Sequence, residues 1–283
     1  MMSLILYYFG VVIALIIILL IILYMCIPSE KYISKNIHHY AFFDKSIQKI
    51  NYHQTNAFYR KLDSVYMSNT IKRELFKTIT DFIKHSNIFE ENNIPKSLRF
   101  IISGKEGIGK TTLIEALATE IDYGLIHFPK NNYSEKMIHA FFNDVNNLLP
   151  SNNIVVFDNI NFNLISEYNK ELYDLLAELI IKNNKNNIFI FIFNELKTIP
   201  YIFSNNFHIH HHYHMDTSIN YVMDMIDDNL DSCDEYKETK LKQIKNNFLQ
   251  LNHKITPGYI IPYLMFNEDF GKSLDRFFKI IKN

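Results

Sequence analysis

The chain has 283 residues, of which 48% are hydrophobic and 21% are charged, and its formal net charge is −1. This composition excludes a disordered chain, and the near-zero charge gives no support to nucleic acid as a partner. The two cysteines, Cys26 and Cys233, are too few for a disulfide framework and have no zinc-ligand spacing, so we expect a reducing compartment.

Residues 1–29 are predicted to form an amino-terminal transmembrane anchor. Residues 4–27 carry no charged side chain, and a helix of that length spans about 36 Å, enough to cross about 30 Å of hydrocarbon. A buried core helix is usually shorter, and a cleaved signal peptide would begin with basic residues and end with small ones. Lys31 and Lys35 are the first basic residues, so the positive-inside rule predicts a single-pass membrane protein with its N-terminus outside and the rest in the cytosol or mitochondrial matrix.

Residues 30–66 mix His, Asn, Tyr and Lys without a clear period, and we interpret them as a linker or a small adaptor. After a cap at Ser68 or Asn69, apolar residues recur at helical spacing and predict an amphipathic helix that ends near Ser86.

Apolar strand-like runs then alternate with helical patterns up to residue 215. The predicted strands are 98–102, 124–128, 154–157, 188–193 and 207–213, and the predicted helices start at Lys110 or cover 134–149 and 166–182. Such alternation is typical of a parallel sheet with helices on both faces, so residues 67–215 are predicted to form an α/β domain.

Residues 216–283 show no strand pattern. The segments 217–229, 234–251, 258–266 and 271–281 have helical periodicity, which predicts a small all-helical domain after the sheet domain.

A phosphate-binding motif follows the first predicted strand of the α/β domain. Residues 104–111 read GKEGIGKT, which matches G-x-x-x-x-G-K-[ST] between a strand and a helix, and they hold three of the seven glycines of the chain. The residues expected to cradle the nucleotide are Gly104, Lys105, Glu106, Gly107, Ile108, Gly109, Lys110, Thr111 and Thr112. In such a loop Lys110 would reach the β and γ phosphates of ATP, and Thr111 would offer its hydroxyl to Mg²⁺.

Polar residues end two later strands and complete the predicted catalytic set. Asp158 follows a buried strand and would be the second magnesium ligand, since ligands bind at the carboxyl ends of strands in open α/β sheets. Asn159 comes next, where such hydrolases usually have a carboxylate; an amide orients water but cannot accept its proton, so we expect slow or absent turnover. Asn194 ends the following strand and is placed to hydrogen-bond the γ phosphate or the attacking water.

The chain from Val65 onward resembles the AAA ATPases, and within them the Bcs-type branch of membrane-anchored mitochondrial chaperones that move the folded Rieske iron–sulfur protein. The resemblance rests on residues 93–95 before the first strand, the phosphate loop with TLIEALA after it, and the segments 255–259 and 263–267 near the C-terminus. It implies strand order 5-1-4-3-2, Asn194 as the first sensor residue, and a helical lid from Met215 onward.

Two departures from the resembled family bear on catalysis. Lys105 and Glu106 stand where the family usually has two prolines, and no arginine lies between Arg99 and Arg276, where the family places an arginine finger. Lys197 or a protonated histidine could partly substitute, although neither offers the planar fork of a guanidinium.

The alternating histidines His208, His210, His212 and His214 leave two interpretations open. On one face of a strand, two or more could share Zn²⁺, although no cysteine or carboxylate supplies an obvious third ligand. Alternatively, they mark a strand edge near a subunit interface.

The leading functional hypothesis is a membrane-anchored AAA-type ATPase that binds ATP and Mg²⁺, forms a homo-oligomeric ring, and acts as a chaperone or translocase on a protein substrate. The alternative is a nucleotide-binding scaffold with weak or no hydrolysis. A small GTPase is disfavoured because residues 184–187 read NKNN and lack the aspartate that reads guanine, and a nucleotide kinase would need several arginines after the loop.

Overall fold

The structure of the chain is a computed structural model, and it describes residues 38–55, 60–92, 96–129, 134–148, 152–158, 170–183, 185–194, 207–216, 218–229, 242, 245–246, 256–258 and 260. All of them belong to one compact unit, Ile33–Asn283. The predicted anchor, Asn159, Lys197 and most of the predicted helical domain lie outside the described residues. Within the part of the chain that is described, no helix is both long enough and apolar enough to cross a membrane.

The described residues form an α/β structure whose elements follow the predicted alternation. The strands are β1 (His38–Asp44), β2 (Lys49–Thr55), β3 (Ser97–Gly104), β4 (Gly124–His127), β5 (Asn153–Asp158), β6 (Asn187–Phe193) and β7 (His211–Met215). The helices are the 3₁₀ turn η1 (Leu62–Ser64), α2 (Asn69–Lys84), α3 (Ser86–Glu91), α4 (Lys110–Glu120), α5 (Glu135–Asn143), the π-helical turn η2 (Asp144–Leu148), α6 (Lys170–Ile181) and α8 (Ile219–Asn229).

The seven strands form one mixed sheet in the order β2-β1-β4-β5-β6-β3-β7. Every neighbouring pair is parallel except the β1–β2 hairpin, which is antiparallel. The five strands β3 to β7 therefore have the expected order 5-1-4-3-2, and the hairpin extends the sheet beyond β4. The last strand begins at His211 and not at Phe207, because His208 adopts a left-handed conformation with φ of 46° that a strand does not accommodate.

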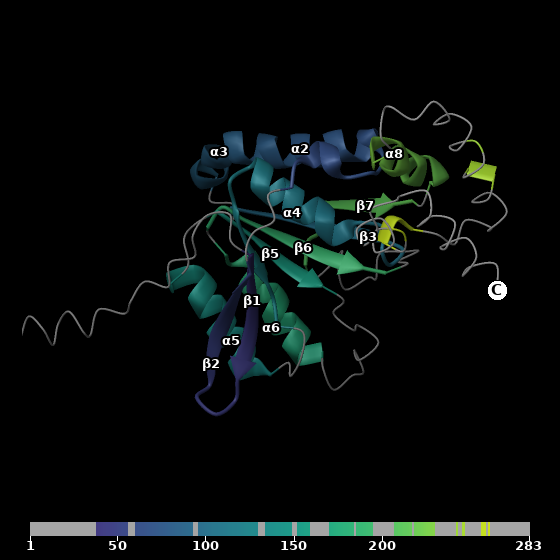
Figure 1. Ribbon diagram of the computed structural model, residues 1–283. Coiled ribbons are helices and arrows are strands. Elements are labelled where there is room, and N and C mark those ends of the chain that lie inside the picture. Colours follow the sequence, from purple (N-terminus) through teal and green to yellow (C-terminus); the bar gives the residue numbers. More distant parts are fainter. Residues whose placement is uncertain are drawn as a thin grey trace, which may run out of the picture. The chain divides into compact units, whose positions relative to one another are not determined.

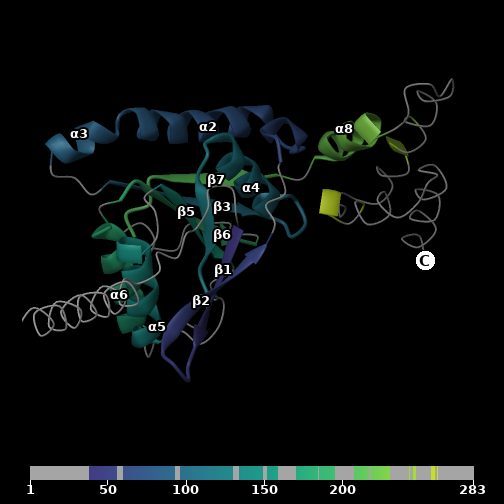
Figure 2. The ribbon, with the colours of Figure 1, turned by 60° about the vertical axis from the view of Figure 1, so that its left-hand side comes forward.

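Helices cover the sheet on two faces, as Figures 1 and 2 show. On one face α2 and α4 pack against the isoleucines of β6, and on the other α5 and α6 pack against its phenylalanines. Successive side chains of a strand point to opposite faces, so the alternating sequence of β6 places all the isoleucines in one core and all the phenylalanines in the other. The phenylalanine core is dense in ring contacts, with Phe191 stacked 4.8 Å from Phe157 and edge-on to Phe207.

Two side-chain caps begin helices where the sequence places them. The Ser68 hydroxyl accepts a hydrogen bond from the Ile71 backbone at the start of α2, and Ser134 accepts one from Met137 at the start of α5. The segment predicted as one helix over 134–149 is an α-helix to Asn143 that continues as a π-helical turn to Leu148.

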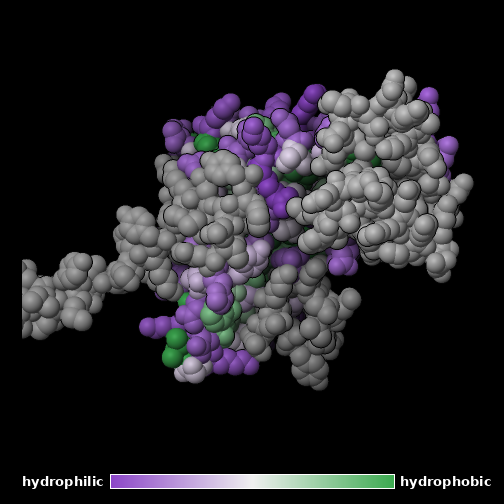
Figure 3. Space-filling view, in the orientation of Figure 1, coloured by the Kyte–Doolittle hydropathy of each residue, from purple (hydrophilic) through white to green (hydrophobic). Residues whose placement is uncertain are grey.

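The β1–β2 hairpin lies in the segment interpreted as a linker or small adaptor, and no strand was predicted there. Ala41 and Ile50 on its inner face join the core beside α5, and the Tyr52 hydroxyl donates to Asp144 Oδ2 at 3.1 Å. Burial and the neighbouring Asp144 carboxylate raise the pKa of Tyr52, so the phenol stays protonated and keeps this hydrogen bond. Figure 3 shows hydrophobic surface over the hairpin, where Phe42 and Ile47 are exposed.

We predict that Phe191→Ala lowers the free energy of unfolding by about 3–5 kcal/mol, because it opens a cavity among packed rings. The matched control, Phe42→Ala on the exposed side of the hairpin, is expected to cost less than about 1 kcal/mol. Chemical denaturation of the detergent-solubilised chain measures both values. Equal losses would mean that the phenylalanine core does not carry the stability of the sheet.

Candidate functional site

The predicted phosphate loop connects β3 to α4, and its backbone suits an anion. Gly107 and Gly109 have φ values of 74° and 101°, which L side chains rarely adopt. Gly109 caps α4 without a side-chain hydrogen bond, and a Cβ built on it would meet no atom within 4 Å. The space beside Gly109 is therefore open next to the start of α4, where the first N–H groups of a helix have no intrahelical partner and can bind phosphate.

Lys110 opens α4 and lies folded onto the loop. Its Nζ donates to the carbonyl oxygens of Gly104 at 2.6 Å and Lys105 at 2.8 Å. Burial lowers the pKa of Lys110, while the nearby carboxylates of Asp158 and Glu106 act in the opposite direction. The ammonium group is thus held over the loop and close to Asp158, where a phosphate oxygen could replace a loop carbonyl as its acceptor.

The remaining predicted site residues lie at the same edge of the sheet, as far as they are described. Asp158 is the last residue of β5, Asn194 directly follows β6 and is exposed, and Thr111 lies in the first turn of α4. A hydroxyl and a carboxylate suit Mg²⁺, which keeps several waters and takes few protein ligands. The residues present therefore fit a magnesium nucleotide, although their individual contacts with it stay predictions.

A segment near the C-terminus closes against the middle of the loop. The Gly258 N–H donates to the Gly107 carbonyl at 2.9 Å, and a Cβ on Gly107 would lie 2.5 Å from Thr256 Oγ1. Glycine is required on both sides, because a Cβ on Gly258 would lie 2.9 Å from the Gly107 backbone. The Thr256 hydroxyl is buried and has no hydrogen-bond partner among the residues that the structure describes. Sequence reasoning used residues 255–259 only as a mark of resemblance and missed this contact.

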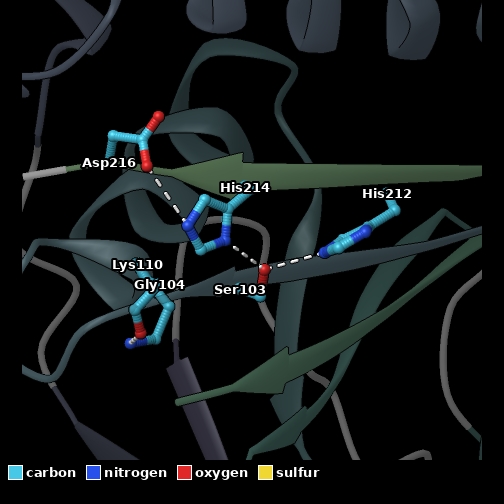
Figure 4. A network of polar contacts seen from close by, with 6 residues as sticks. All are labelled: Ser103, Gly104, Lys110, His212, His214 and Asp216. Carbon is cyan, nitrogen blue, oxygen red and sulfur yellow. Dashed lines mark hydrogen bonds and ion pairs between the residues drawn. The ribbon is translucent and has the colours of Figure 1, made fainter. Parts of the chain in front are cut away.

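Two of the alternating histidines form a polar network beside the loop (Figure 4). The Ser103 hydroxyl lies 2.7 Å from His212 Nε2 and 2.8 Å from His214 Nδ1, and His214 Nε2 lies 3.2 Å from Asp216. Burial, and then the neighbouring His214, lower the pKa of His212. No group of three or more metal-ligating side chains is found among the described residues. His212 and His214 each form a hydrogen bond with Ser103, the residue before Gly104.

Comparison with known proteins places this geometry in a family. Residues 100–214 match the model of the "ATPase family associated with various cellular activities (AAA)". The chain carries an AAA domain. This confirms the resemblance to AAA ATPases, and the sheet order and the loop between β3 and α4 agree with it.

Two relatives and one solved structure show how far the similarity extends. The chain is 32% identical over 66 residues to the "probable mitochondrial chaperone bcs1" of Schizosaccharomyces pombe, covering 23% of this chain and 15% of that protein. It is 26% identical over 103 residues to the "probable mitochondrial chaperone BCS1-A" of Dictyostelium discoideum, and this match covers 36% of this chain and 24% of that protein. The structure of C. elegans PCH-2 aligns with a TM-score of 0.55 over 77% of this chain and 69% of that one, at 13% identity, which shows a shared fold.

The similarity to the two chaperones is limited to part of their length. The matches span a quarter or less of the length of the two chaperones. The comparisons therefore show an AAA domain and a distant, partial similarity to the BCS1 chaperones.

We predict that Asp158→Ala weakens Mg²⁺-dependent nucleotide binding about tenfold or more, a loss seen even for residues that only support a metal ligand. Binding without Mg²⁺ should change little, because the carboxylate then has no cation to hold. Titration of a fluorescent ATP analogue, with Mg²⁺ and with EDTA, measures both. Asp216→Ala, which removes an exposed carboxylate after β7, is the matched control; an equal loss with and without Mg²⁺ would show that Asp158 is not the metal ligand.

Proposed function

We propose that the chain is a membrane-anchored AAA-type ATPase that binds ATP with Mg²⁺ and acts as a chaperone or translocase on a protein substrate. The observation that carries the proposal is the convergence at one sheet edge of a glycine-lined loop, a buried lysine and the carboxylate of Asp158, the last residue of β5. That donor set suits a nucleotide triphosphate, since it supplies backbone N–H groups and an ammonium for phosphate and an oxygen ligand for the metal.

Each residue has a binding or orienting role in the proposed reaction. The backbone of residues 107–109 and the start of α4 hold the phosphates, and Lys110 exchanges its loop carbonyls for phosphate oxygens. Thr111 and Asp158 would hold the magnesium ion, which would supply positive charge to the phosphates. Asn194, at the end of β6, orients the attacking water.

The contact between Gly258 and Gly107 supports a route from nucleotide to movement. Because these two backbones touch and leave no room for a side chain, a change in the loop moves the segment that contains Thr256. We infer that the region from residue 216 onward is a helical lid, and that its displacement is passed to the substrate.

Anchoring, assembly and location rest on sequence. The charge-free residues 4–27 support a bilayer span, and the names of the two relatives support a mitochondrial chaperone role. The positions of Lys31 and Lys35 support an AAA domain in the cytosol or the mitochondrial matrix. Assembly into a homo-oligomeric ring is proposed because AAA ATPases typically oligomerise.

A second candidate is a nucleotide-binding scaffold with weak or no hydrolysis. Two features of the sequence favour it: Asn159 replaces the usual second carboxylate, and no arginine lies between Arg99 and Arg276 to act as a finger. Such a finger contributes on the order of 10³-fold or more to phosphoryl transfer in related systems.

Steady-state ATP hydrolysis by the detergent-solubilised chain distinguishes the two candidates. For the ATPase we expect turnover that Lys110→Ala abolishes, because the substitution removes the ammonium that faces the phosphates. Lys182→Ala, which removes an exposed lysine directly after α6, is the matched control and should keep full activity. Turnover equal to that of Lys110→Ala, with nucleotide still bound, would favour the scaffold.

The mass of the solubilised chain, measured by light scattering with and without ATP, tests the ring. We expect a large oligomer that ATP stabilises, since binding to the assembled state alone shifts the equilibrium towards it. A monomer under both conditions would contradict the ring and leave nucleotide binding unaffected.

A further inference from the structure

Arg99 is a buried cation, and no acidic side chain among the described residues pairs with it. Its side chain is 7% exposed, and its Nε and Nη1 atoms are buried without a hydrogen-bond partner in the described part of the chain. Burial lowers the pKa of Arg99, and no described acidic group opposes that shift. A guanidinium stays charged in proteins, and an unpaired buried charge costs several kcal/mol. The buried Arg99 side chain therefore calls for a group that accepts its hydrogen bonds and balances its charge.

Among the described residues, the Arg99 guanidinium has one polar side-chain contact, the ring of His210. His210 Nε2 lies 3.3 Å from Arg99 Nη2, while His210 Nδ1 accepts a hydrogen bond from the Arg99 backbone N–H at 3.0 Å. Burial and then the Arg99 charge lower the pKa of His210 to about 4, so the ring is neutral at pH 7. With Nδ1 as acceptor, the proton of a neutral imidazole is on Nε2.

Two hydrogen-bond donors therefore face each other, because Nη2 of Arg99 has no acceptor capacity. The other tautomer does not remove the conflict, since a proton on Nδ1 would leave the Arg99 backbone N–H without its acceptor. In either state one donor lacks an acceptor, and an acceptor placed beside both groups would satisfy them together.

The surroundings suit an added small group. Ser97 lies two residues before Arg99 on the same face of β3, and its buried hydroxyl also has no partner. The His210 ring packs against Arg99 while part of the residue stays exposed, and His210 directly precedes β7, the edge strand of the described sheet, so the group of donors lies near that edge. A water molecule would accept a hydrogen bond but leave the guanidinium charge uncompensated, whereas an oxyanion supplies both acceptor and charge.

We propose that Arg99 and His210, with Ser97, form a binding site for a small oxyanion, a phosphate or carboxylate group, at the end of β3 opposite the nucleotide loop. The planar guanidinium matches both kinds of oxyanion, and the Nε2–H of neutral His210 adds a second donor. The slight exposure of Arg99 restricts the ligand to a free ion or the end of a small molecule. This site is independent of the proposed ATPase function.

The test uses the full chain carrying Lys110→Ala, so that phosphate at the nucleotide loop does not contribute. Sodium phosphate and sodium acetate are compared with sodium chloride at equal ionic strength, and the melting temperature is measured. We expect phosphate, acetate or both to raise it by about 3–5 °C when the ion is about tenfold above its dissociation constant. The ion that stabilises identifies the group that the site prefers.

Arg99→Met in the same background should abolish that rise and leave the melting temperature in chloride unchanged or higher, because it removes an unpaired buried charge. Arg73→Met, which removes an exposed arginine of α2, is the matched control and should keep the rise. The proposal is overturned by an equal rise in Arg99→Met, or by no rise with either ion in the parent.

A second measurement does not depend on whether Arg99→Met folds. The chain has four arginines, Arg60, Arg73, Arg99 and Arg276, so ¹⁵N-arginine labelling gives four Nε signals that variants of the other three assign by elimination. We expect the added ion to shift the Arg99 signal and slow its exchange with water. An Arg99 signal that neither ion moves would refute the site.

Discussion

The parallel pairing of β3 with β6 on one side and β7 on the other is the constraint on which the rest of the structure depends. All eight residues of β3 are buried, and its backbone is paired with a strand at each side. Because parallel strands end at the same edge, this pairing brings the loop with Lys110 to the same edge of the sheet as Asp158 and Asn194, which come from distant parts of the sequence. A slip of one residue would turn Ile101 and Ser103 towards α4 and separate Ser103 from the histidines of β7.

Much of the α/β fold could be predicted because short stretches of sequence indicate its strands and its phosphate loop. The runs that became β5 and β6 are continuously apolar, as strands buried on both faces must be, and the loop motif fixes where β3 ends and α4 begins. The strand order came from a resemblance and not from spacing, since nothing local in β3 says that it lies between β6 and β7.

The β1–β2 hairpin was not predicted, because its mostly polar sequence gives little indication that one of its faces is buried. Lys49, Asn51 and His53 alternate with Ile50 and Tyr52 in β2, and the inner face becomes a core only through contact with α5, about ninety residues further on. The start of β7 was misplaced for the opposite reason. Phe207 is apolar and fully buried and therefore fits a strand pattern, but the positive φ of His208 breaks the strand there.

Some residues of the candidate site could likewise be predicted from the sequence, and others could not. The residues of the loop are contiguous and the motif names them, whereas Thr256 and Gly258 contact the loop from about 150 residues away. A glycine required by close backbone approach looks in sequence like any other turn residue. The alternating histidines were noticed, but only the register of β7 against β3 shows that His212 and His214 meet on the Ser103 hydroxyl.

The two ends of β3 therefore pose different physical problems. At the carboxyl end of β3, Gly104 leads into the phosphate loop, and the Lys110 ammonium donates its hydrogen bonds to loop carbonyl oxygens. At Arg99, about 16 Å away along the strand, the donors have no such substitute. An apolar residue would suit that face, as Ile101 does two residues later, and would avoid the cost of burying a charge. Because ligands at sites this far apart and without shared contacts stabilise a fold additively, an oxyanion at Arg99 would strengthen the pairing of β3 with β7 whether or not nucleotide is bound.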